Sequence, residues 1–195
     1  MTVLKTLLTT IFVMAFATTA NAITILYNFE NNGNDTFSEL QFDDVTSSGT
    51  LMTVNSFGGA INQGNRGLGV SGAPEGGRLG LGEALIFSVA GYNIQSVTAT
   101  FFETGNQDED VFFGTQAVTV LGGGGGASTQ SFSETFAAPV SSFSVLGLEP
   151  NAAGNRGVRV ASIEVTLLPV PVPASGGLLL LALIGLGLNN KLRKR

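Results

Sequence analysis

The chain has 195 residues, 44% of them hydrophobic, and its nine basic and 14 acidic side chains give a formal net charge of −5. It contains no histidine, cysteine or tryptophan. Catalytic triads need histidine, disulfides need cysteine, and ordinary zinc sites need one or both of these residues. These chemistries are therefore excluded.

The charges are unevenly distributed. All three lysines and two of the six arginines lie near the termini, so residues 23–168 hold four arginines against all 14 carboxylates, which gives a formal charge of −10. An acidic surface without lysine repels phosphate, and we exclude nucleic acid as a partner. A Ser-Lys dyad is excluded for the same lack of lysine, so carboxylate chemistry is what remains for an enzyme.

The first 22 residues have the features of a secretory signal peptide. Lys5 precedes an apolar stretch at residues 7–16, and the small residues Ala20 and Ala22 fit an A-x-A cleavage site. The apolar stretch is shorter than the ~20 residues of a spanning helix. We expect the mature chain to begin at Ile23.

Residues 23–168 are long enough for one domain with a core of its own. Apolar and polar residues alternate at 23–29, 85–89, 97–101, 118–120 and 143–145, and turn-forming sequences lie between these segments. A period of two indicates strands with one buried face. About nine short strands at this spacing predict an all-β fold, an antiparallel β-sandwich that is jelly-roll-like.

The last strand changes phase. Val158 and Val160 share one phase, and the odd-numbered residues from Ala161 to Leu167 share the other. Since a slip of one residue moves a side chain to the opposite face, a β-bulge is predicted near Val160 and Ala161.

Twelve phenylalanines lie in this domain, and most are expected in its core. The adjacent pairs Phe101-Phe102 and Phe112-Phe113 differ, because neighbours on a strand point to opposite faces. One ring of each pair is expected either to pack between two sheets or to be exposed, where it would offer a stacking surface for sugars.

Three glycine-containing motifs are interpreted as structural. Residues 67–72 match G-x-G-x-x-G, but proline and further glycines follow where a dinucleotide site needs a helix. The sequence Gly-Asn-Arg-Gly at 64–67 recurs at 154–157, which predicts a shared turn; the alternative is an anion clamp formed by Arg66 and Arg156. Five glycines at 122–126 lack the Lys and Ser/Thr of a P-loop and predict a hairpin tip.

Asp108, Glu109 and Asp110 place three carboxylates in succession. Hard oxygen ligands suit Ca²⁺, so these residues are the candidate metal site, although the run lacks the D-x-D-x-D-G spacing of calcium loops. A solvated loop is the alternative. The same carboxylates, or Asp43 and Asp44, are also candidates for the paired acids of a glycosidase.

The carboxyl-terminal region, 169–195, has three parts. A proline motif at Val170, Pro171, Val172, Pro173 and Ala174 begins a 19-residue stretch without charge, which ends at Leu188 and is followed by a basic cluster. About 20 apolar residues cross a bilayer as a helix, and basic residues favour the cytoplasmic side. We expect a single transmembrane helix with residues 23–168 outside the cytoplasm.

With its signal peptide, proline motif, hydrophobic stretch and basic end, the chain resembles the bacterial PEP-CTERM sorting-signal proteins, in particular their Val-Pro-x-Pro-Ala variants. Val172 stands where the name-giving motif has glutamate. The resemblance implies processing by an exosortase, a membrane-embedded cysteine transpeptidase-like protease, and release or transfer of the body. Residues 67–70 and 83–87 are also similar to sequences in bodies that carry this signal.

These observations predict an exported, non-catalytic protein of the cell surface or extracellular matrix, tethered transiently in the inner membrane, with extracellular polysaccharide as a candidate partner. Two alternatives stay open. One is a calcium- or glycan-binding module delivered by the same route, and the other is a carboxylate-dependent polysaccharide hydrolase.

Overall fold

The computed structural model describes residues 21–30, 35–46, 48–71, 77–103, 108–122, 128–148 and 157–170. The chain divides into two units, and the larger, Ala22–Pro169, contains all the described strands. The other unit, 1–21 and 170–195, contributes only Asn21 and Val170 to these ranges. The predicted signal peptide and transmembrane helix therefore lie outside the described residues.

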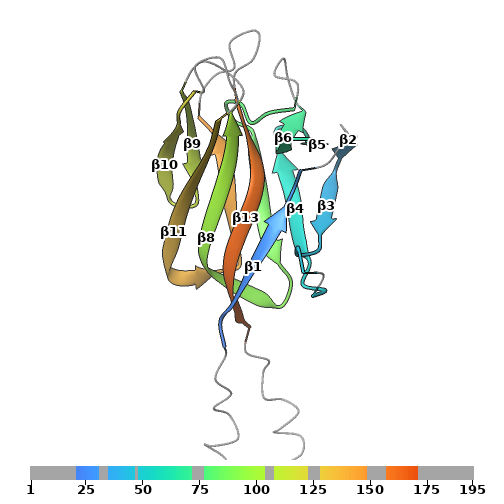
Figure 1. Ribbon diagram of the computed structural model, residues 1–195, viewed down its shortest axis with the longest axis vertical. Coiled ribbons are helices and arrows are strands. Elements are labelled where there is room, and N and C mark those ends of the chain that lie inside the picture. Colours follow the sequence, from blue (N-terminus) through green and yellow to red (C-terminus); the bar gives the residue numbers. More distant parts are fainter. Residues whose placement is uncertain are drawn as a thin grey trace, which may run out of the picture. The chain divides into compact units, whose positions relative to one another are not determined.

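Two antiparallel sheets pack face to face in the larger unit (Figure 1). Sheet A has the order β11-β8-β13-β6-β5-β2, with β1 also paired to β13, and sheet B has the order β10-β9-β12-β7-β4-β3. The strands of sheet A are β1 (Ile23–Asn28), β2 (Asp35–Phe37), β5 (Ala60–Gly64), β6 (Gly67–Ser71), β8 (Tyr92–Glu103), β11 (Ser128–Val140) and β13 (Val158–Pro169). The strands of sheet B are β3 (Glu39–Phe42), β4 (Met52–Phe57), β7 (Ala84–Val89), β9 (Glu109–Phe113), β10 (Gln116–Val120) and β12 (Ser142–Gly147).

The predicted all-β fold and antiparallel β-sandwich are confirmed. The predicted number of strands is too low, because the described ranges contain thirteen. The additional strands include β5, where Asn62 and Gln63 are buried and the alternation of apolar and polar residues is lost. Burial of these amides is offset by hydrogen bonds, such as the one that Gln63 Nε2 donates to the carbonyl of Phe29 at 3.2 Å.

Phenylalanine rings form a continuous contact path through the core. Ring centroids lie 4.7 to 6.1 Å apart along this path, within the range of favourable edge and offset contacts. The rings in contact order are Phe42, Phe29, Phe87, Phe143, Phe113, Phe101 and Phe132. Because sheet A and sheet B both contribute rings, the path joins the two layers of the sandwich.

The predicted bulge in the last strand is confirmed. The register between β13 and β8 shifts between Val160 and Ser162, and Val160 and Ala161 are both buried. The N–H of Phe29 donates to the carbonyl of Ala161 at 3.0 Å. The extra residue thus lets both phases of β13 point into the core.

The glycine motif at residues 67–72 contributes a strand rather than a cofactor loop, since Gly67–Ser71 is β6. Asn65 and Arg66 form the turn between β5 and β6, where Gly64 pairs with Gly67. Gly67 has φ of 107°, a conformation that disfavours other residues. The predicted turn at 64–67 is confirmed, and its second copy at 154–157 lies outside the described residues except for Gly157.

Candidate functional site

The first and last strands bring the two ends of the larger unit together. Ile23, at the start of β1, is the partner of Leu167 near the end of β13. Figure 1 shows the beginning of β1 and the end of β13 at the same end of the sandwich. Ala22 and Val170, which flank β1 and β13 in the sequence, are both exposed. Ala20 and the rest of the proline motif, 171–174, lie outside the described residues.

The three candidate calcium ligands point in different directions. Asp108 is exposed and its Oδ1 accepts a hydrogen bond from the N–H of Gly122 at 2.9 Å. Asp110 Oδ1 accepts one from the hydroxyl of Thr119 at 2.6 Å on the neighbouring strand β10. Glu109 begins β9 and is buried, with 3% of its surface exposed. Alternation along the strand therefore separates Glu109 from the other two.

Within the described ranges no three Asp or Glu residues lie close enough to hold a metal ion. Glu109 instead lies near Arg78, whose pKa is lowered by burial, an effect that the charges of Glu103 and Glu109 partly oppose. Calcium binding at residues 108–110 stays a prediction, and this arrangement of the side chains does not favour it.

Three of the four arginines of the domain lie close enough to influence one another. The pKa of Arg78 is lowered, mainly by burial. The negative charge of Glu103 partly opposes this effect, and the positive charge of Arg66 adds to it. Burial also lowers the pKa of Arg159, and the nearby charges of Arg78 and Arg66 add to this effect. The sequence suggested a clamp of Arg66 with Arg156, but Arg156 lies outside the described residues, and the structure groups Arg66 with Arg78 and Arg159.

Hydrogen bonds and a ring contact fix this arginine cluster. Arg159 donates from Nη1 to the carbonyl of Gly67 at 3.1 Å and from Nη2 to Asn62 Oδ1 at 2.9 Å. The guanidinium carbon of Arg66 lies 4.9 Å from the centre of the Phe102 ring, a cation–π distance. These contacts join β5, β6, β8 and β13 at one end of sheet A.

The adjacent phenylalanine pairs divide as strand geometry requires. Phe101 and Phe113 are fully buried, whereas Phe102 and Phe112 are partly exposed on the outer faces of their sheets. Arg66 covers part of the Phe102 ring. Phe102 is therefore a partly accessible aromatic surface on sheet A.

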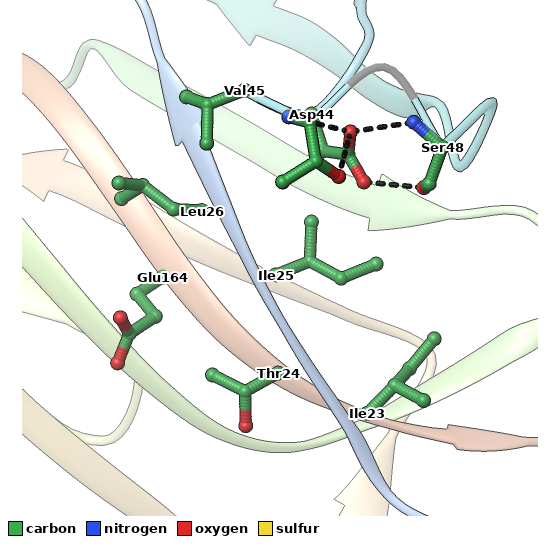
Figure 2. Close-up of a pocket in the computed structure, with 9 residues that line it drawn as sticks. Ile23, Thr24, Ile25, Leu26, Asp44, Val45, Ser48 and Glu164 are labelled. Carbon is green, nitrogen blue, oxygen red and sulfur yellow. Dashed lines mark hydrogen bonds between the residues drawn. The ribbon is translucent and has the colours of Figure 1, made fainter.

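A cavity of about 400 Å³ lies beside the edge of β1 that does not pair with β13 (Figure 2). Its lining residues are Ile23, Thr24, Ile25, Leu26, Asp44, Val45, Thr46, Ser48 and Glu164. The N–H of Val45 donates to the carbonyl of Leu26 at 3.1 Å, which attaches the loop after β3 to this edge. Leu26 and Val45 are nevertheless 39% and 56% exposed, so the cavity is open and partly apolar.

Asp44 organises the loop that borders this cavity. Its Oδ1 accepts hydrogen bonds from the N–H and hydroxyl of Thr46 at 3.0 and 2.9 Å and from the N–H of Ser48 at 2.8 Å. The hydroxyl of Ser48 donates to Oδ2 (Figure 2). These bonds, those of Ser48 above all, lower the pKa of Asp44.

The ionised state of Asp44 bears on the hydrolase alternative. Asp44 and Glu164 are the carboxylates that line the cavity. A glycosidase needs one carboxyl group that stays protonated to act as an acid, whereas the hydrogen bonds to Asp44 favour its charged form. Asp44 therefore does not fit the acid of such a pair, although an ionised Asp44 fits the nucleophile or base.

In fold, the described part of the chain is a two-layer antiparallel β-sandwich. Within it no helix is long and apolar enough to cross a membrane. The sequence matches no protein-family model, and no curated protein is significantly similar to it.

Proposed function

We propose that the protein is an exported, non-catalytic β-sandwich of the cell surface or extracellular matrix, delivered by a signal peptide and processed at its carboxyl-terminal sorting signal by an exosortase-like enzyme. One observation carries the proposal. The folded unit spans Ala22–Pro169, so it begins one residue before the expected mature start at Ile23 and ends immediately before the motif that starts at Val170. Cleavage on both sides would leave every described strand intact.

The chemistry of the motif supports this division. Pro169 is the last residue of β13 and pairs with Tyr92 of β8. Proline recurs at 171 and 173, and proline has no N–H to donate to a neighbouring strand. The sequence after β13 is therefore unsuited to further pairing within the sheet, which favours its use as a processing site.

The fold supports the same type of protein. From β7 onward, the chain alternates between the sheets apart from the β9-β10 hairpin: β7, β9, β10 and β12 belong to sheet B, and β8, β11 and β13 belong to sheet A. Such alternation is what a jelly roll requires, and we include a jelly-roll-like topology in the proposal. Sandwiches of this kind serve widely as binding or structural domains, so function depends on their surfaces.

The membrane steps follow from sequence. The 19 uncharged residues at 170–188 provide a transient helix in the inner membrane, and the basic residues after it favour the cytoplasmic side. The acidic domain then lies outside the cytoplasm, where processing releases it or attaches it to extracellular polysaccharide.

Intact-mass measurement of the surface or secreted protein tests the proposal. The expected product begins at Ile23 and lacks the segment after the Val-Pro-Val-Pro-Ala motif. Replacing both Pro171 and Pro173 by alanine should leave the tail attached, whereas Pro139→Ala, at an exposed position of β11, should not. A full-length tail in the inner membrane would show a simple single-pass anchor, and an uncut cytosolic chain would contradict export altogether.

A further inference from the structure

The outer face of sheet A carries a regular arrangement of hydroxyl groups. The order β1-β13-β8-β11 places exposed or half-exposed side chains in three rows across four strands. The rows are Asn28-Ser162-Thr100-Ser131, Leu26-Glu164-Thr98-Ser133 and Thr24-Thr166-Ser96-Thr135. We refer to these twelve residues as the hydroxyl face. Nine of them are serine or threonine, so hydroxyl groups dominate this surface.

Hydrogen bonds orient the hydroxyl groups in pairs across the strands. Thr98 Oγ1 lies 2.8 Å from Ser133 Oγ, and Thr100 Oγ1 lies 2.9 Å from Ser131 Oγ. A third pair at 3.3 Å joins β1 to β13. A hydroxyl has one donor and two acceptor positions, so each pair keeps both a donor and acceptors for another molecule. Their positions are fixed before any ligand arrives.

Charge limits the kind of ligand that fits. Glu164 is the one charged residue among the twelve, in a domain of formal charge −10. The outer face of sheet B carries two acidic residues, Glu39 and Asp110. Arg66 and Arg159 lie beside Phe102, beyond the twelve residues. The hydroxyl face itself is nearly neutral and has no basic residue to pair with phosphate, sulfate or carboxylate groups. Neutral sugar hydroxyls are complementary to it because they too donate and accept.

The spacing of the face favours a chain of sugars over a single one. Neighbouring strands are about 4.8 Å apart and alternate residues on a strand about 6.7 Å apart, so hydroxyl pairs repeat in two directions. The rows lie on an open sheet face, where each contact is weak and affinity must come from repetition. Phe102 adds an aromatic surface at the end of the face, next to Arg159 and Thr129 across the strands.

We infer that the hydroxyl face binds a neutral polysaccharide chain. This inference rests on the proposed function, because it names the partner that holds the exported domain in the extracellular matrix. Binding uses hydrogen bonds from the oriented hydroxyl pairs, with a sugar ring stacked against the accessible part of Phe102.

Affinity electrophoresis of the soluble domain, residues 23–169, in gels that contain dextran, amylose, a β-1,3-glucan or xylan tests the inference, since this unit contains all the described strands. The charged polysaccharide alginate provides a comparison. Replacing Thr98 and Thr100 by valine keeps side-chain shape and strand propensity but removes two hydroxyl pairs. We expect retention by at least one neutral polysaccharide and a fall in its affinity of about tenfold in this variant.

A matched double variant on the opposite face is the control. Thr53 and Ser88 are neighbours across β4 and β7 on the outer face of sheet B, and replacing them by valine and alanine should leave retention unchanged. Urea unfolding of both variants checks that each is folded. Retention by none of the neutral polysaccharides, retention by alginate alone, or an equal loss in both variants would overturn the inference. Intact-mass analysis of the native protein tests the sorting proposal separately, so failure of one is distinguishable from failure of the other.

Discussion

Glu134 of β11 binds Thr115 in the turn between β9 and β10, and so links the edge of sheet A to the edge of sheet B. The N–H of Thr115 donates to both carboxylate oxygens of Glu134, at 2.9 and 3.1 Å, and its hydroxyl donates to Oε1. Gln116 Nε2 adds a bond to the carbonyl of Ser133 at 3.2 Å. At this margin of the sandwich, side chains connect the sheets where the backbone ladders do not.

Replacing Glu134 by alanine should lower the free energy of unfolding by about 1 to 2 kcal/mol, because the N–H of Thr115 loses a charged acceptor. Thr135→Ala changes an exposed neighbour on the same strand and should cost less than about 0.5 kcal/mol. Urea unfolding of both variants measures the difference. Equal stabilities would show that the Glu134 contact does not hold the two edges together.

Gly69→Ala should be strongly destabilising for a steric reason. A Cβ at Gly69 would meet the carbonyl oxygen of Gly77 at 2.0 Å, and that atom belongs to the backbone. The expected cost is about 3 kcal/mol, measured by thermal or urea unfolding.

Gly82→Ala is the matched control for Gly69→Ala. Gly82 has φ of 77°, but a Cβ there meets nothing within 4 Å, so its cost should be near 1 kcal/mol from backbone conformation alone. Similar losses of unfolding free energy in the two variants would contradict the steric explanation for glycine at position 69 in β6.

Local sequence patterns predicted the parts of this fold that depend on neighbouring residues. Alternation indicated β1, β7 and the long strands β8 and β13, and the phase change at Val160 located the bulge. The pattern failed at β5, because Asn62 and Gln63 are buried through hydrogen bonds to residues distant in sequence. No local signal shows such partners.

The candidate sites were harder to predict because they depend on which strands become neighbours. Arg66, Arg78 and Arg159 come together only once β6 pairs with β13. The serines and threonines of the hydroxyl face are ordinary residues for the exposed side of a strand. Their arrangement in rows follows from the order β1-β13-β8-β11, which no single segment encodes.

Calcium should have little effect on the stability of this domain. Asp108 and Asp110 each accept a hydrogen bond from another residue, and Glu109 is buried near Arg78. Because these carboxylates diverge, we expect equal melting temperatures in Ca²⁺ and in chelator. A rise in melting temperature with Ca²⁺ that is lost in Asp108→Asn would instead support the calcium-binding alternative.

Asp44 should make stability depend on pH in the acidic range. Hydrogen bonds from Ser48 and Thr46 lower its pKa in the folded state. The stabilisation is therefore complete above the unfolded-state pKa, near 4, and is lost as the pH falls through the lower folded-state value. Urea unfolding from pH 6 to pH 2 should show a smaller acid-dependent loss in Asp44→Asn than in the wild type. Ser48→Ala should give an intermediate result, and identical pH profiles in all three proteins would contradict this role.

Tyr27 should act in the opposite direction at alkaline pH. Its side chain is fully buried, and its hydroxyl donates to the carbonyl of Thr50 at 2.9 Å. Burial raises the pKa of Tyr27, and the negative charges of Asp44 and Asp43 raise it further. A raised folded-state pKa means that the stabilisation is complete below the unfolded-state pKa, near 10, and is lost as the pH rises through the folded-state value.

Tyr27→Phe separates the two effects of the hydroxyl. At neutral pH the variant should lose about 1 kcal/mol, the net value of one hydrogen bond. Above pH 10 its unfolding free energy should fall less steeply than that of the wild type, because no buried phenol remains to ionise. Urea unfolding measures the free energy at neutral pH and its fall above pH 10, and phenolate absorbance follows the ionisation of tyrosine. An alkaline slope that Tyr27→Phe leaves unchanged would show that another group controls unfolding in that range.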